Sequence, residues 1–134
     1  MISRFFYLLS AAFLLLFACK KQSDPIIQPE DNAGKGGSGS LKVAVSHHSK
    51  PISNAIVFIK YNTSEQPLSF DDSVACVWEN GKAIANFSSL KKGQYYLLGK
   101  GYDTTIFQNV IGGIPYKLAE ETAIAITLPV TEDH

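Results

Sequence analysis

A period of two in the side chains runs through much of the chain after residue 40, and it limits the fold more than any other feature. In the segment LKVAVS, residues 41–46, the side chains of Leu41, Val43 and Val45 share one face of an extended chain. The segment AIVFIKY, residues 55–61, places Ala55, Val57, Ile59 and Tyr61 together on one face. Successive side chains of a strand point to opposite faces, so such segments bury one face and expose the other. The pattern predicts β-strands.

Turn signals separate the alternating segments at short intervals. The Asn80-Gly81 pair is the strongest, because both residues accept the positive φ that a two-residue hairpin requires. Gly93 marks a second turn. The alternation and the turns give seven candidate strands, at residues 41–46, 55–61, 73–78, 82–87, 94–100, 104–111 and 122–130. This part of the chain shows no amphipathic helix, and short strands at this spacing predict a β-sandwich or a barrel closed over one core.

The first 18 residues have the features of an export signal. Arg4 gives a basic start, and residues 5–18 are apolar except for Ser10 and end at the small residue Ala18. These 14 residues are too few to span a bilayer, which needs roughly 20, but they match the apolar region of a secretory signal. Residues 16–19, LFAC, then resemble the lipobox of bacterial lipoproteins, in which the signal is cut before the cysteine.

The lipobox resemblance implies that Cys19 becomes the mature N-terminus. Its thiol would carry a diacylglyceryl group and its amine commonly a third acyl chain, and two or three chains anchor a protein stably. The alternative is an ordinary signal or a buried helix in which the cysteine is incidental. The sequence CKKQS lacks the Asp after Cys that retains many lipoproteins in the inner membrane, so the resemblance favours the outer membrane. The leaflet, periplasmic or surface-exposed, stays open.

Length and charge limit the mature chain to one small domain. Removing residues 1–18 leaves 116 of the 134 residues, which suffices for one domain and a tail. The precursor has 12 basic and 12 acidic residues, and the loss of Arg4 leaves 11 against 12. A nearly neutral chain lacks the basic stripe that binding to nucleic acid requires, so we expect no nucleic-acid partner.

Composition divides the mature chain into a tether and a folded part. Residues 20–40 are rich in Pro, Gly, Ser and charged side chains and have no apolar period, which predicts a flexible linker. An ordered strand near residues 25–28 is the alternative. The expected division is a signal at 1–18, the lipidated Cys19 with its linker at 19–40, a β-sandwich at 41–130 and a polar tail at 131–134.

Two segments of the expected sandwich resemble a known family. PISNAIVFI, residues 51–59, resembles the second strand of prealbumin-like, carboxypeptidase regulatory-like domains and their Cna B-type relatives, and residues 80–97 resemble a hairpin of those domains. The resemblance covers about residues 41–130 and implies a seven-stranded Greek-key β-sandwich of prealbumin-like type. In the hairpin it implies that Phe87, Leu90, Tyr95 and Leu97 face the core. Such domains brace a neighbouring enzyme, adhesin or outer-membrane receptor.

The residues that could carry chemistry are few. Neighbours on a strand point to opposite faces, so His47 and His48 cannot chelate one metal ion from an extended strand. In a turn the pair could bind an ion weakly, and the alternative that we expect is a polar loop without a ligand. Cys76 is expected to be a buried free thiol on the same strand face as Val74 and Trp78. The sequence assigns no catalytic residue, no metal ligand and no cofactor.

Two activities of prealbumin-like and Cna B-type domains lack their residues here. Hydroxyisourate hydrolases rely on several histidines, an arginine and a C-terminal Tyr-Arg-Gly-Ser, whereas this mature chain has no arginine and ends in TEDH. Lys42 and Lys60 could donate to an isopeptide bond, but residues 122–130 contain neither Asn nor Asp. A hydrolase that uses Cys76 with His47 or His48 is not excluded by counting, although nothing in the sequence brings these groups together.

Aromatic residues suggest a contact surface. Tyr96, Tyr102 and Tyr116, with Trp78, could stack on a glycan, and the alternative is that Trp78 and most tyrosines complete the core. Residues 111–121 are expected to form an irregular loop with an exposed Tyr116, a further contact site. We therefore expect a membrane-anchored, non-catalytic binding or accessory module that engages an envelope protein in trans. A surface glycan-binding module is the alternative, and an unrecognised hydrolase is a weaker one.

Overall fold

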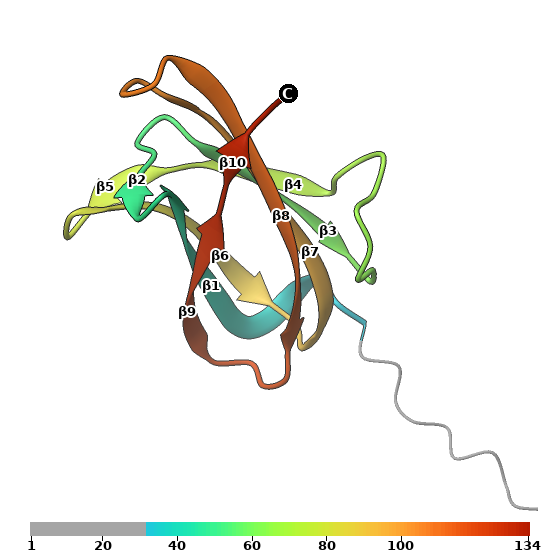
Figure 1. Cartoon of the computed structure of the whole chain (residues 1–134). Helices are drawn as coiled ribbons and strands as arrows, with labels where there is room; N and C mark the ends of the chain where they lie inside the picture. Colours follow the sequence, from blue (N-terminus) through green and yellow to red (C-terminus); the bar gives the residue numbers. More distant parts are fainter. Residues whose placement is uncertain (1–31) are drawn as a thin grey trace, which may run out of the picture.

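The computed structural model describes residues 32–134 and consists of strands and turns only (Figure 1). Cys19, the expected signal at residues 1–18 and most of the expected linker lie outside the described residues. Within residues 32–134, no helix has the length and apolar character needed to cross a membrane. The all-β class predicted from the alternation is confirmed.

Ten strands form two sheets in this part of the chain. They are β1 (Lys35–His47), β2 (Lys50–Pro51), β3 (Ile56–Tyr61), β4 (Asp72–Ala75), β5 (Val77–Glu79), β6 (Lys82–Leu90), β7 (Gly93–Asp103), β8 (Gln108–Leu118), β9 (Ala123–Pro129) and β10 (Thr131–Glu132). One sheet has the order β2-β1-β6-β5, with β9 also paired to β1, and the other has the order β10-β8-β7-β3-β4. The pair β1 and β9 is parallel, while the other pairs are antiparallel. Figure 1 shows the chain passing from one sheet to the other between β9 and β10.

The core lies between the sheets and is built from alternate residues of the strands. Leu41, Val43 and Val45 of β1 are at most 1% exposed. The four hairpin residues that were expected to face inward are also buried in the core, namely Phe87, Leu90, Tyr95 and Leu97. The inward face expected for β1 is therefore confirmed, and so are the inward residues that the resemblance implied for β6 and β7.

The Asn80-Gly81 turn is confirmed between β5 and β6. Asn80 has φ 50° and Gly81 has φ 76°, and the strands pair from Glu79↔Lys82 onwards. Both residues adopt the left-handed conformation that a two-residue turn of this kind requires.

The folded part begins earlier than expected, because residues 35–40 of the predicted linker belong to β1. Gly37 and Gly39 allow β1 to approach its neighbours more closely than residues with a side chain would. A Cβ on Gly37 would lie 2.2 Å from the carbonyl oxygen of Leu90, and one on Gly39 would lie 2.8 Å from a methyl carbon of Leu118. Lys35 and Gly39 both pair with Leu90, so the strand bulges between them. A glycine-rich composition that resembles a linker is here a strand pressed against its neighbours.

The expected loop at residues 111–121 is also mostly strand, since β8 runs from Gln108 to Leu118 and pairs along its whole length with β7. Gly112 and Gly113 suggested a loop, but both lie where a side chain has no room. A Cβ on Gly112 would lie 2.2 Å from the carbonyl oxygen of Pro129, and one on Gly113 would lie 2.3 Å from the Tyr96 hydroxyl. Small residues are required there for packing.

Trp78 is not a core residue, because the strand predicted at residues 73–78 is divided at Cys76. Its first part is β4 in one sheet, and its second part is β5 at an edge of the other sheet. Val74 and Cys76 are partly buried against the core, whereas Trp78 is 63% exposed. The division of this strand and the two-residue strands β2 and β10 account for ten strands in place of the expected seven.

Candidate functional site

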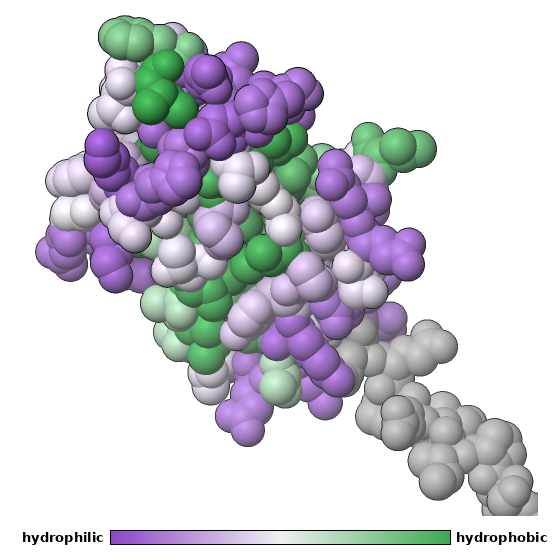
Figure 2. Space-filling model, in the orientation of Figure 1, coloured by the Kyte–Doolittle hydropathy of each residue, from purple (hydrophilic) through white to green (hydrophobic). Residues whose placement is uncertain are grey.

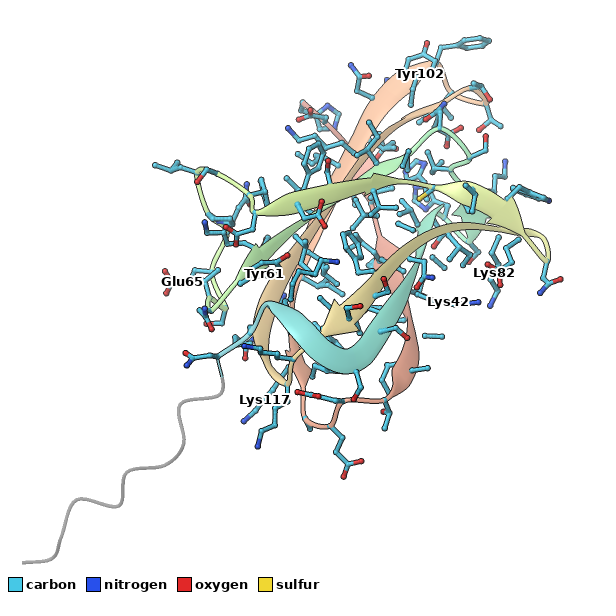
Figure 3. All side chains as sticks on the ribbon, turned by 180° about the vertical axis from the view of Figure 1, so that it is seen from behind. Lys42, Tyr61, Glu65, Lys82, Tyr102 and Lys117 are labelled. Carbon is cyan, nitrogen blue, oxygen red and sulfur yellow. The ribbon has the colours of Figure 1, made fainter. Side chains whose placement is uncertain are left out.

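The two buried polar or charged side chains of the described residues, His47 and Asp103, lie together at one end of the sandwich. β1 and β7 end there, and β10 lies beside them. The described chain begins at the other end, where Ala33 lies against Gly93 at the start of β7, opposite Leu118 at the end of β8 (Figure 1). Figure 3 shows the same separation from behind, with Tyr102 at one end of the domain and Lys117 at the other.

His47 is buried at the end of β1 and bound by Asp103 from the end of β7. Its side chain is 2% exposed, and its Nδ1 lies 2.7 Å from Oδ2 of Asp103. An ionised carboxylate only accepts hydrogen bonds, so Nδ1 of His47 carries the hydrogen. The other oxygen of Asp103 accepts from the hydroxyl of Thr105 at 2.6 Å and from the N–H of Thr105 at 2.8 Å. These donors, first the Thr105 hydroxyl and then His47, hold the pKa of Asp103 well below its ordinary value.

His48 lies beside His47, although neighbouring residues of a strand should point apart. His48 has φ 45° and the next residue, Ser49, has φ 64°, so the chain turns here into β2. The ring centroids of the two histidines are 4.2 Å apart. The expected turn is therefore present from His48, and it places the two rings on one side, but His47, the last residue of β1, is buried and does not belong to a polar loop.

Glu132 approaches both histidines from β10. Its Oε1 lies 3.5 Å from Nε2 of His47 and 3.8 Å from Nε2 of His48. The N–H of its own backbone, and next the two histidines, lower the pKa of Glu132. Pairing of β10 with β8, with Glu132 opposite Val110, fixes the carboxylate over the end of β1.

A small pocket opens over these groups, and it contains an unsatisfied atom. The pocket has a volume of about 150 Å³ and is lined by His47, His48, Lys50, Asp103, Thr105, Ile106 and Glu132. Nε2 of His47 is buried there without a hydrogen-bond partner. Buried polar atoms almost always have a partner, so an atom without one indicates a site that accepts something. His47, His48 and Glu132 each offer one ligand atom, and these atoms lie within 4.8 Å of one another.

The turn between β7 and β8 projects apolar side chains beside this pocket. We call Tyr102, Ile106 and Phe107 the tip, and they are 39%, 41% and 76% exposed. Figure 2 shows apolar side chains at the end of this hairpin with hydrophilic ones around them. Asn54 fixes the base of the turn, because its side chain donates to the carbonyl of Tyr102 and accepts from the N–H of Tyr102.

The three tyrosines proposed as a contact surface are not brought together. Tyr96 is 8% exposed, with its hydroxyl near Gly113. Tyr116 pairs with Tyr95 and packs against the core. Tyr102 shares the outer face of β7 with Tyr96, but six residues of strand separate them by about 20 Å.

Cys76 does not join the histidine cluster. It does not line the pocket beside His47, and burial raises the pKa of its thiol to about 11. A thiol with a raised pKa is a poor nucleophile, so the geometry offers no support for a cysteine hydrolase.

Comparisons of the chain with protein-family models, with curated proteins and with solved structures found no match. The evidence for a functional role of the histidine cluster and of the tip is therefore their geometry. The polar turn expected at residues 47–50 is the local signal that places two histidines on one side. No local signal connects them to Asp103, which is 56 residues from His47.

Proposed function

We propose that the protein is a lipid-anchored, non-catalytic module of the bacterial cell envelope that binds another envelope protein through the tip. The acylated Cys19 would hold it in a membrane, preferably the outer membrane, and the residues between Cys19 and Asn32 would serve as the tether. The tip would make the contact with the partner in trans.

The observation that carries this proposal is the conformation and exposure of Phe107. Its φ is 57°, and its side chain is 76% exposed. A residue with a Cβ in the left-handed region costs roughly 1–2 kcal/mol, and a Gly or Asn would cost less. Exposure of a large aromatic side chain gains nothing for the fold. Strained residues of this kind gather at functional sites, which supports a contact of Phe107 outside the domain.

The position of the tip supports the same proposal. The start of the described chain, where the tether would join the domain, and the turn between β7 and β8 lie at opposite ends of the sandwich (Figure 1). A tether attached at that end leaves the tip facing away from the anchoring membrane. Aromatic side chains with neighbouring aliphatic ones are enriched at the centres of protein interfaces.

A photo-cross-linking experiment in cells tests the partner. The full chain would carry a benzoyl-phenylalanine at position 107 or, as a control, at position 68, where Leu68 is fully exposed on the β3–β4 loop. We expect one dominant protein adduct from position 107 and not from position 68, and we expect Ile106→Ser to weaken it. No adduct at position 107, or the same adducts from both positions, would refute a partner site at the tip.

We also propose the Greek-key, prealbumin-like form of the sandwich. It is supported by the β5–β6 turn at Asn80-Gly81 and by the inward packing of Phe87 and Tyr95. An experimental structure whose sheets lacked the orders β2-β1-β6-β5 and β10-β8-β7-β3-β4 would contradict it.

Trp78 favours a second candidate, a glycan-binding module. It is 63% exposed on the edge strand β5, next to Val77 at 62%, and a flat exposed ring is suited to stacking on a sugar face. Because Trp78 is the only tryptophan, its fluorescence reports directly on such binding. Titration with purified envelope glycan should then shift the emission, and Trp78→Ala should abolish retention on that glycan. An unchanged emission would remove this candidate.

A further inference from the structure

The cluster of His47, His48 and Glu132 lies beside the tip, and Ile106 lines its pocket, but the contact proposed for the tip does not use the ligand atoms of these three residues. We propose that these three residues bind one divalent transition-metal ion of the zinc type, and that Asp103 positions His47 for it. This proposal is independent of the partner proposed for the tip, so either can fail without the other.

The first argument is the orientation of the buried ring. Asp103 accepts the hydrogen of Nδ1, so a metal ion would meet the ring at Nε2, where the lone pair of the unprotonated form lies. That atom is buried and makes no hydrogen bond of good geometry, since Glu132 Oε1 at 3.5 Å is too distant, and it faces the pocket that His48 and Glu132 also line. Histidine ligands of zinc commonly donate their other ring N–H to a carboxylate, which fixes the tautomer and the ring. Asp103 holds His47 in that arrangement.

The second argument is spacing. Zinc bonds of 2.0–2.1 Å in a tetrahedral site place neighbouring ligand atoms about 3.3 Å apart. Glu132 Oε1 lies 3.5 Å from Nε2 of His47 and 3.8 Å from Nε2 of His48. The ligand atoms of all three residues lie within 4.8 Å. His48 is on a turn and its side chain is 75% exposed, so a small rotation of this residue would complete the set.

The third argument is ligand chemistry. Two imidazoles and one carboxylate form a ligand set found in zinc proteins, with a fourth position open to water or to another molecule. Imidazole nitrogen selects zinc, copper or nickel over magnesium and calcium, which prefer oxygen. Lys50 also lines the pocket, and the carboxylates of Asp103 and Glu132 outweigh its single charge.

A bound ion would tie together strands from both sheets. His47 is the last residue of β1, His48 follows it on the turn to β2, and Glu132 comes from β10 of the other sheet. An ion that binds only the folded state stabilises it by mass action, so the thermal midpoint should rise with zinc concentration.

The experiment is a titration of the full chain, purified in detergent and stripped of metal with a chelator, with Zn²⁺ alone in a calorimeter. We expect one ion per chain. His48→Ala and Glu132→Gln each remove one ligand from the partly exposed side of the site and should weaken zinc binding at least tenfold. His134→Ala and Glu120→Gln, which change the same residue types outside the cluster, should leave the affinity unchanged.

Cobalt gives a second readout, because Co²⁺ held tetrahedrally by nitrogen and oxygen absorbs visible light strongly. We expect this band in the wild type and its loss in His48→Ala. Asp103→Asn should lower zinc affinity ten- to hundredfold and alter the band, as expected for a residue that positions a ligand. An unchanged band in Asp103→Asn would remove Asp103 from the site.

Two results would overturn the proposal. One is the absence of zinc binding at concentrations up to a millimolar. The other is binding that His48→Ala and Glu132→Gln leave unchanged, since the ion would then be held elsewhere on the chain.

Discussion

Tyr95 joins the beginning of the described chain to the core. Its side chain is fully buried, and its hydroxyl accepts a hydrogen bond from the N–H of Gly34 at 2.9 Å and donates to the carbonyl of Lys91 at 2.5 Å. The residues that precede β1 are thereby fastened to the turn between β6 and β7.

Removing this hydroxyl should loosen the start of the domain. Tyr95→Phe leaves a buried N–H and a carbonyl without their partner, and we expect it to lower the free energy of unfolding by about 1–2 kcal/mol. Urea unfolding followed by circular dichroism measures the change. Tyr102→Phe, at an exposed position, is the matched control and should change stability little. Equal effects of the two variants would contradict this role for Tyr95.

Cys76 allows a prediction about pH. Burial raises the pKa of its thiol from 9.0 to about 11, so at pH 8 the reactive thiolate is about a hundredfold rarer than in the unfolded chain. Alkylation of Cys76, followed by peptide mass spectrometry, should be about that much slower in the native protein than in urea. Because the folded pKa is raised, the associated stability is complete below pH 9 and is lost as the pH rises towards 11. Equally fast alkylation in both states would contradict the burial.

Between elements, Glu121 holds the β8–β9 connection against β1 and the β6–β7 turn. Its carboxylate accepts from the N–H of Ser38 at 3.1 Å, from the Ser38 hydroxyl at 3.2 Å and from the N–H of Lys92 at 3.3 Å. The N–H groups of Ser38 and Lys92 are the main cause of the lowered pKa of Glu121.

Glu121→Gln should therefore destabilise the domain in a pH-dependent way. A lowered folded pKa means that the stabilisation is present above the unfolded glutamate pKa of about 4.3 and is lost as the pH falls through the folded pKa. The difference in thermal midpoint between wild type and Glu121→Gln should be larger at pH 7 than at pH 3. Glu120→Gln, at the neighbouring exposed position, should show no such difference. A difference in thermal midpoint that stayed the same at both pH values would show that the ionised carboxylate of Glu121 is not the source of the stabilisation.

The elements that were predictable from the sequence depend on local physics. Burial of Leu41, Val43 and Val45 follows from alternation, and the turn at Asn80 follows from residues that tolerate positive φ. These signals lie within a few residues, so they can be recognised without knowledge of the fold.

The elements that could not be predicted depend on residues far along the chain that pack against them. Gly37 suggests a linker from sequence alone, but it lies in a strand because the Leu90 backbone leaves no room for a side chain. Gly112 suggests a loop, but it also lies in a strand, where Pro129 leaves no room for a side chain. The candidate site has the same limit, because His47 meets Asp103 and Glu132 only after three strands have found their places. Composition identified the tyrosines as candidates, but the pairing of β7 with β8 places Tyr116 against the core.

For the whole molecule, the topology predicts slow folding. Most strands pair with partners far along the chain, and β1 pairs with β9 from Ser40↔Ala123 to Ser46↔Pro129. Loops of this length must close before the contacts form, so we expect refolding on the scale of milliseconds to seconds. Stopped-flow circular dichroism after dilution from urea measures it. Complete refolding in microseconds would show that local contacts dominate.

The parallel pairing of β1 with β9 also determines how the domain would respond to mechanical force. A membrane tether would pull on the chain at Asn32, while a partner at the tip would hold the opposite end. The pull would run along the axis of β1, which is bonded to β6 on one side and β9 on the other. Its hydrogen bonds would then be sheared together rather than opened one after another, so the domain should transmit tension between the membrane and its partner without unravelling.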